Sequence, residues 1–247
     1  MKSEVHVFSH PLEMAQAAAK LIAEVAKESY KTRCKFTLAL AGGNTPRSLY
    51  QELCADHYAA SIPWAHSHLF WGDERFVPVD HPDSNFAMAS ETLVKHIPIP
   101  ALNVNPIHTD FPTPEEAAAA YERTMRRLFD IFGTLSADNV WPVFDLILLG
   151  VGPDGHTASL FPGSLVLTEQ QKWVAATPVP DLNPQVRRIT LTLPVINEAR
   201  YVVFLVTGRE KQSLVKTILN NPAQAHERYP AARVSPAGEL HWFLVKG

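Results

Sequence analysis

A glycine-rich turn in the middle of the chain holds two residues that could do acid–base chemistry. Residues 144–164 read FDLILLGVGPDGHTASLFPGS, an apolar run followed by a turn that contains Asp154 and His156. An imidazole with an ordinary pKa of about 6.5 can take up a proton near neutral pH, so His156 is a candidate general base. A loop histidine is more often a surface residue. Here we expect a glycine-framed turn that leads from a strand into a helix, and this setting together with the acidic neighbour favours a catalytic role.

The same turn spells G-x-G-x-x-G through Gly150, Gly152 and Gly155, a pattern that also occurs where dinucleotides bind. Asp154 would place a negative charge against the pyrophosphate. The next expected strand, near residues 172–176, does not end in an acidic residue that could bind the ribose. The sequence therefore argues against a nicotinamide or flavin cofactor.

A second glycine turn, Gly42-Gly43-Asn44-Thr45, comes directly before an expected helix. Its backbone N–H groups and the Thr45 hydroxyl could hold a phosphate at the helix N-terminus, although a tight turn alone would also explain the glycines. Because no Lys-Ser/Thr pair follows, a nucleoside triphosphate is disfavoured. We expect Asn44 or Thr45 to cap this helix and Pro46 to be its first residue.

Charged residues follow two further apolar strands. Asp73, Glu74 and Arg75 form a run that would ordinarily be solvated, but its place at a strand end predicts that at least one member points into a cleft. Arg75 could bind a phosphate through two hydrogen bonds, and Asp73 could orient a hydroxyl or a base. Lys211 follows another strand, in or near the first turn of a helix, where a solvent-facing side chain is the alternative.

The elements around these turns alternate between strand and helix patterns. This alternation predicts an α/β fold with a doubly wound, mostly parallel, Rossmann-like sheet and helices on both faces. Ligands bind beyond the carboxyl ends of such strands, so the four turns should converge on a site for a phosphorylated small molecule. Strands are expected at residues 4–8, 36–41, 68–71, from 144, near 173–176, 187–193, 201–206 and, as an edge strand, 241–245; helices are expected at 12–28, from 46, 84–95, 114–132 and 210–219.

The composition is that of an ordinary globular chain of 247 residues with a formal net charge of −3. It contains no basic tract that would favour nucleic acid or an anionic membrane, and nothing marks a linker, so we expect one domain over residues 1–247. The largely apolar stretch at residues 143–149, which Asp145 interrupts, is too short to span a bilayer, and the N-terminus lacks a basic region followed by an apolar core. We expect a cytoplasmic protein.

The cysteines and the other histidines do not predict a metal site. Cys34 and Cys54 are too few for a disulfide framework or a metal cage, and we expect buried or half-buried free thiols. His57, His66 and His108 show no ligand spacing typical of zinc. We therefore expect no metal.

Six motifs follow one another along nearly the whole chain: AGGNTP at 41–46, GDERFVP at 72–78, DSN at 83–85, GVGPDGHTASLFPG at 150–163, RITLTLP at 188–194 and TGREK at 207–211. In this order and spacing they resemble the motifs of the 6-phosphogluconolactonases, part of a larger group that includes glucosamine-6-phosphate isomerase/deaminase. The resemblance implies a Rossmann-like α/β fold and hydrolysis of 6-phospho-D-glucono-1,5-lactone to 6-phosphogluconate in the oxidative pentose phosphate pathway. It also implies an enzyme that needs no metal or organic cofactor.

The resemblance assigns a role to each motif residue. It implies that His156 deprotonates water for attack on the lactone carbonyl and that Asp154 orients or tunes His156. Backbone N–H groups in the glycine turns are candidates for the oxyanion donors. The substrate-binding residues that it implies are Gly42, Gly43, Thr45, Arg75, Arg188 and Lys211 on the phosphate side, with Asp73 and Asn85 on the sugar side.

The deaminase branch is the closest alternative, because it resembles this chain in the phosphate turn and in the D-G-H core. In that branch the segment after D-G-H reads A-F-N-E-P and supplies a glutamate that assists ring opening, whereas residues 157–162 here read TASLFP. DER also replaces the DEY of that branch. A catalytically idle phosphosugar-binding module is disfavoured by the intact His156, Asp154 and Arg75. Lactone hydrolysis is therefore the favoured interpretation.

Overall fold

The computed structural model describes residues 2–135 and 139–246. Its main sheet has six parallel strands in the order β1-β9-β8-β5-β2-β3. This confirms the expected doubly wound, mostly parallel α/β sheet. The strands are β1 (Lys2–Phe8), β2 (Phe36–Leu40), β3 (Ser67–Trp71), β5 (Leu146–Leu149), β8 (Tyr201–Val206) and β9 (Glu239–Val245).

Helices cover the sheet because each parallel step needs a crossover. The connections that run across the sheet toward β3 contain α1 and α2, which pack on each other. The connections that return toward β9 contain α5 and α7. Since such crossovers are right-handed, these two sets fall on opposite faces. The helices are α1 (Pro11–Arg33), α2 (Thr45–Leu53), α3 (Asp56–Ser61), α4 (Asn85–Thr92), α5 (Pro114–Ile131), α6 (Leu193–Asn197), α7 (Arg209–Asn220) and α8 (Pro222–Arg228).

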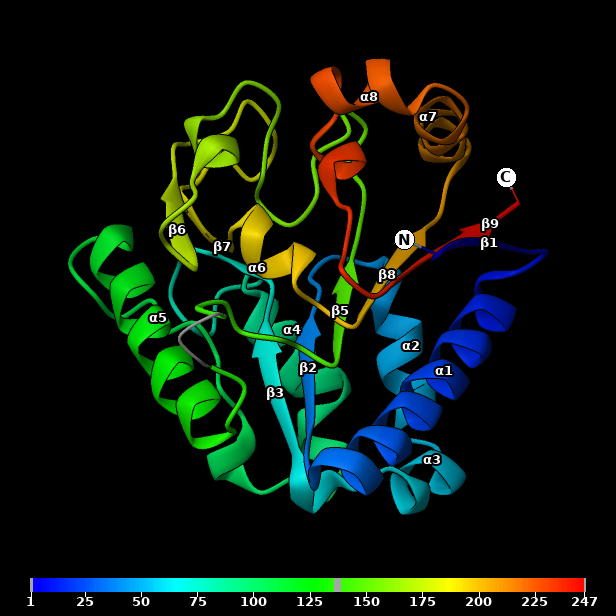
Figure 1. Ribbon diagram of the computed structural model, residues 1–247, viewed down its shortest axis with the longest axis vertical. Coiled ribbons are helices and arrows are strands. Elements are labelled where there is room, and N and C mark those ends of the chain that lie inside the picture. The colour runs from blue at the N-terminus through cyan, green and yellow to red at the C-terminus, as the bar shows by residue number, and fades with distance from the viewer. Residues whose placement is uncertain (1, 136–138, 247) are drawn as a thin grey trace.

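Three short strands form a second, antiparallel sheet in the order β4-β7-β6. They are β4 (Asp73–Arg75), β6 (Val174–Thr177) and β7 (Arg188–Leu191). The strands expected near 173–176 and 187–193 therefore exist, but they lie outside the main sheet, and Leu193 begins α6. Figure 1 shows β2, β3 and β5 with their arrowheads toward the end of the molecule that carries α7 and α8.

Two expectations are wrong: the position of the last strand in the sheet and the structure that follows the His156 turn. The strand at residues 241–245 is not at an edge, because β1 pairs in parallel on its outer side and β8 on its inner side. The turn around His156 does not lead into a helix: residues 157–164 are irregular, apart from a bridge between Thr157 and Leu160.

Two expectations about helix ends also need correction. Helix α2 begins at Thr45 rather than Pro46, and neither Asn44 nor Thr45 makes a capping bond through its side chain; Thr45 Oγ1 lies 3.0 Å from Thr207 Oγ1 instead. Cys34 is exposed rather than buried, because it ends α1 in the left-handed conformation with φ 57°. Cys54 is half-buried, as expected, and both thiols are free.

The central strands are buried on both faces, as parallel strands between helix layers must be. Every residue of β2 and of β5 is buried. Within the described part of the chain, no helix is long and apolar enough to cross a membrane.

One buried carboxylate ties three elements together at the end of the sheet away from the strand tips. Asp145, just before β5, accepts hydrogen bonds from the Thr37 N–H at 2.8 Å and from Arg33 Nη2 at 2.9 Å. The Asp145 N–H in turn donates to Thr37 Oγ1 at 2.9 Å. Its side chain is only 4% exposed, so these donors stabilise a charge that would otherwise be costly to bury.

We expect Asp145→Ala to lower the free energy of unfolding by about 3 kcal/mol, because it leaves a guanidinium and a buried N–H without their acceptor. Chemical denaturation at neutral pH measures this loss. Asp130→Ala, at an exposed position near the end of α5, is the matched control and should change stability by less than about 0.5 kcal/mol. Equal stabilities of the two variants would contradict the role given to Asp145.

Candidate active site

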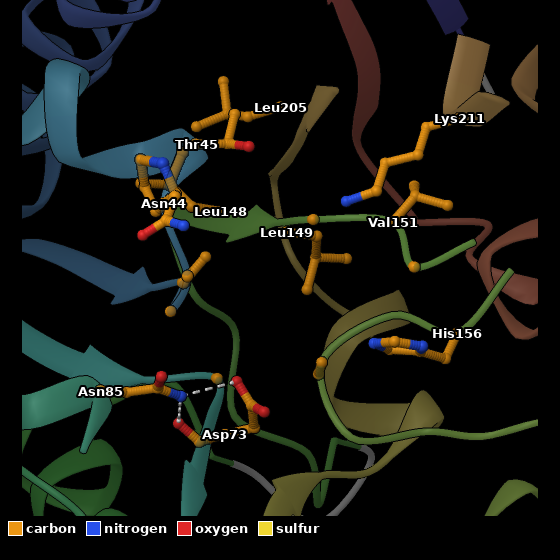
Figure 2. Close-up of a pocket in the computed structure, with 18 of the residues that line it drawn as sticks. Asn44, Thr45, Asp73, Asn85, Leu148, Leu149, Val151, His156, Leu205 and Lys211 are labelled. Carbon is orange, nitrogen blue, oxygen red and sulfur yellow. Dashed lines mark hydrogen bonds between the residues drawn. The ribbon is translucent and has the colours of Figure 1, made fainter. Parts of the chain in front are cut away.

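The four glycine and charge turns do converge, on a cavity of about 220 Å³ at the carboxyl ends of β2, β3, β5 and β8. Figure 2 shows the His156 ring and the Lys211 side chain directed into this pocket from one side, with Asp73 and Asn85 on the other. Of the site residues expected from the sequence, only Asp154 does not line the pocket. The others all do: Gly42, Gly43, Thr45, Asp73, Arg75, Asn85, His156, Arg188 and Lys211.

Asp154 lies directly behind His156 and holds its ring. Asp154 Oδ1 is 2.6 Å from His156 Nδ1 and also accepts a hydrogen bond from the His156 backbone N–H at 3.1 Å. The turn leaves no room for a side chain at Gly152, where a Cβ atom would lie 2.1 Å from the imidazole ring. Gly155 adopts φ +82°, in the left-handed region, and faces the Tyr229 ring. The glycines of this turn therefore create the space that the His–Asp pair occupies.

The electrostatics of the pair define which nitrogen of His156 is available. Burial acts to raise the pKa of Asp154, but the hydrogen bonds from His156 and its nearby charge outweigh that effect and lower it. An ionised carboxylate accepts a hydrogen bond from Nδ1–H and so favours the tautomer with the proton on Nδ1, which leaves Nε2 of a neutral ring with a free lone pair. This lone pair can act as a base toward a molecule in the pocket.

Two arginines lie side by side in the pocket wall, and neither forms a direct ion pair with a carboxylate of the described residues. Arg75 on β4 is paired directly with Arg188 on β7, so their side chains share one face of the small sheet. Arg75 Nη1 donates to the Asp83 carbonyl at 2.6 Å and Arg188 Nη2 to the Pro184 carbonyl at 3.2 Å. Both Nε atoms are buried and make no hydrogen bond among residues 2–135 and 139–246.

Within residues 2–135 and 139–246, no carboxylate lies within 4.0 Å of the guanidinium of Arg75 or of Arg188. Burial lowers the pKa of Arg188, which is 4% exposed. Like charges placed opposite each other destabilise a sheet, and unpaired buried donors add to that cost. An anion bound between Arg75 and Arg188 would relieve both effects.

Asp73 is fixed in place by neighbours from two other segments. Its Oδ2 accepts a hydrogen bond from Ser159 Oγ at 2.6 Å, and its Oδ1 lies 3.3 Å from Asn85 Nδ2. Asn85 Nδ2 also donates to the Asp73 carbonyl at 2.9 Å. A Cβ atom at Gly42 would lie 1.9 Å from Asn85 Oδ1, so this glycine makes room for the amide. These polar groups form the wall opposite His156.

Glu74 lies between Asp73 and Arg75 in the sequence and has a structural role. Its side chain points away from the cavity because neighbouring residues of a strand face opposite sides. It accepts hydrogen bonds at 2.7 Å from the N–H groups of Arg75, Asn85 and Phe86, and so caps the start of α4. Burial raises its pKa to about 7, against the opposing effect of these donors. Glu74 thereby positions Asn85.

Two residues near the pocket carried no signal in the sequence. Ser159 holds Asp73, as described above, and it is fully buried. The Phe161 ring contacts both His156, at 4.7 Å between ring centroids, and the Arg188 guanidinium, at 5.4 Å from the ring centroid. Both follow His156 in an irregular loop, where residue type and spacing do not reveal which way a side chain points.

An oriented base and two adjacent arginines without a direct ion pair, at the strand ends of a Rossmann-like sheet, define an α/β site for a small anionic molecule. A family model described as glucosamine-6-phosphate isomerases/6-phosphogluconolactonase matches residues 9–242. The chain belongs to this family.

Relatives in the family cover most of the chain. A 6-phosphogluconolactonase from Synechocystis is 43% identical over 84% of this chain and 81% of its own length. One from Rattus norvegicus is 42% identical, covering 97% of this chain and 90% of its own. The solved structure of a 6-phosphogluconolactonase from Trypanosoma brucei matches with a TM-score of 0.85 at 33% identity, covering 99% of this chain and 97% of that one.

We expect Gly152→Ala to lower turnover by about 100-fold, because the added Cβ displaces the His156 ring from Asp154. Thermal stability should change little, since the backbone at Gly152 is not in the left-handed region and only a side chain has to move. Steady-state kinetics with a parallel thermal melt measures both quantities.

Gly133→Ala is the control, because it should affect stability and not turnover. Gly133 has φ +66° at the end of α5, away from the pocket, so alanine there should lower the melting temperature and leave turnover unchanged. Full activity in Gly152→Ala would show that the packing of glycine against His156 does not matter for the reaction.

Proposed function

We propose that this chain hydrolyses 6-phospho-D-glucono-1,5-lactone to 6-phospho-D-gluconate, a step of the oxidative pentose phosphate pathway. The observation that carries the proposal is the combination of the His156–Asp154 pair with the adjacent Arg75 and Arg188 in one cavity. The named relatives, at 42–43% identity, support the same reaction.

In the proposed mechanism His156 is the general base. Its Nε2 takes a proton from a water molecule as the water oxygen attacks the lactone carbonyl, and Asp154 stabilises the imidazolium that forms. The tetrahedral intermediate then breaks the bond to the ring oxygen, which receives the proton from His156. The products are a carboxylic acid and a free hydroxyl. A lactone carbonyl is already electrophilic, so one base and donors for the oxyanion are sufficient.

The phosphate is held by cations at a distance from the base. Arg75 and Arg188 offer N–H groups that lack a partner in the described chain, and Lys211 extends into the same cavity. The Gly42-Gly43 turn precedes α2 and Thr45 is the first residue of this helix, whose N-terminus favours an anion. Asp73 and Asn85 face the sugar hydroxyls. This division of tasks fixes the lactone ring against His156 while the protein makes no covalent bond to it.

We further propose that residues 1–247 act as one domain, that the protein works in the cytoplasm, and that it takes no nucleic acid partner. The pocket draws its lining from residues 41 through 211, which supports a single unit. The formal net charge of −3 supports the absence of a nucleic acid partner.

We expect His156→Ala to lower kcat for the phosphorylated lactone by about 10²- to 10⁴-fold while binding of 6-phosphogluconate is retained. A pH-stat assay of acid release from freshly made lactone, corrected for spontaneous hydrolysis, measures kcat, and calorimetry measures binding. His108→Ala, at an exposed position, is the control. If wild-type protein released ammonia from glucosamine 6-phosphate but no acid from the lactone, the proposed function would be wrong.

We expect Arg75→Ala to lower kcat/KM for the phosphorylated lactone by about 10- to 150-fold, the loss of a charge-assisted hydrogen bond worth about 1.5–3 kcal/mol. Unphosphorylated gluconolactone should show little change, because it has no phosphate to lose. Arg187→Ala is the matched control, since Arg187 pairs with Glu115 outside the pocket. Equal losses on both substrates would remove the phosphate assignment.

A further inference from the structure

A second group of chemically capable side chains lies on β1 and β9. The parallel register places Glu4 opposite His241, and His6 follows Glu4 by two residues on the same face of the sheet. One ligand atom from each of Glu4, His6 and His241 lies within 4.8 Å of the others. None of the three lines the pocket of the proposed active site, which lies at the tips of β2, β3, β5 and β8.

The three ligand atoms have the spacing of a metal-coordination face. His6 Nε2 and His241 Nδ1 are 3.2 Å apart, and Glu4 Oε2 is 3.5 Å from the first and 3.7 Å from the second. A point equidistant from the three atoms of this triangle lies about 2.0 Å from each, which matches the bond lengths of Zn²⁺ to imidazole nitrogen and carboxylate oxygen. The spacing of the three atoms is therefore already that of ligands around a bound ion.

The surroundings of His241 supply the partner that a metal-bound histidine requires. With Nδ1 as the ligand, the proton of His241 sits on Nε2, and Nε2 lies 3.3 Å from Glu239 Oε2. The His241 side chain is 6% exposed, and its Nε2 makes no hydrogen bond of good geometry in the described chain. The carboxylate of Glu239 is thus placed where it can fix the tautomer and raise the basicity of the ligand.

We propose that Glu4, His6 and His241 bind Zn²⁺, with water in the fourth position, and that the ion cross-links β1 to β9. Two imidazoles and one carboxylate select a transition metal over Mg²⁺ or Ca²⁺, which prefer all-oxygen sites. The bound ion would hold an edge strand: among the described residues β1 pairs with β9 alone, and Val5 and Val7 on its other face are exposed. The proposal is independent of the lactonase chemistry.

The test begins with full-length protein stripped by EDTA and titrated with Zn²⁺ against a chromophoric chelator. We expect one equivalent to bind and the melting temperature to rise by about 5–10 °C at a free Zn²⁺ concentration near 100 times Kd. Mg²⁺ should have no effect. Co²⁺ in place of Zn²⁺ should give the visible absorption of a four-coordinate site.

The variants His6→Ala and Glu4→Gln are chosen because both side chains are only half-buried, so the fold should tolerate them. Each should weaken Zn²⁺ binding by more than about 100-fold. His57→Ala, exposed on α3, is the matched control and should bind as the wild type does. Lactone hydrolysis is measured alongside and should not respond to metal removal or to these substitutions, so a failure of either proposal is visible separately.

Two outcomes overturn the zinc site. Wild-type affinity in His6→Ala and Glu4→Gln would place the ion elsewhere, at His156 for example, where it would also inhibit hydrolysis. A Kd for Zn²⁺ weaker than about 10 μM in wild-type protein would mean that the cluster is only a histidine–histidine hydrogen bond beside a glutamate.

Discussion

The site depends on a contact between two like charges that no direct ion pair with a carboxylate of the described residues offsets. Arg75 and Arg188 are directly paired across β4 and β7, and Arg188 is buried. One backbone carbonyl accepts a hydrogen bond from each guanidinium, which lowers the cost of the arrangement without removing its positive potential. The folded chain thus carries a local cost that a bound anion relieves. Folding thus places the two cations together at a free-energy cost, and relief of that cost adds to the affinity for the phosphate.

The positions of the functional side chains in turn depend on space left by glycines. A side chain at Gly42 would overlap Asn85, and one at Gly152 would overlap His156. In each case the glycine stands at a strand end where a neighbouring polar residue has to pass. The glycine-rich motifs of this chain therefore act as much by making room as by offering N–H groups to a ligand.

Local patterns predicted the strands and turns well, because apolar runs and glycines at their ends reflect local physics. The relations between distant segments were harder to predict. That residues 241–245 form an inner strand depends on β1 pairing outside them, and that β7 leaves the main sheet depends on its pairing with β4. The roles of Glu74 and Ser159 depend on which neighbours reach them in space, as does the meeting of His6 with His241.

One irregular loop joins the two halves of the site. The base belongs to the turn after β5 in the main sheet, whereas both arginines belong to the small sheet. The loop that follows His156 connects them: the Ser159 N–H donates to Thr190 Oγ1 on β7 at 3.2 Å, and Ser159 Oγ donates to Asp73 at 2.6 Å on β4. Phe161 then contacts both His156 and Arg188. Because a helix in this position could not offer these contacts in succession, the irregular backbone after His156 is what fixes the base relative to the arginine pair.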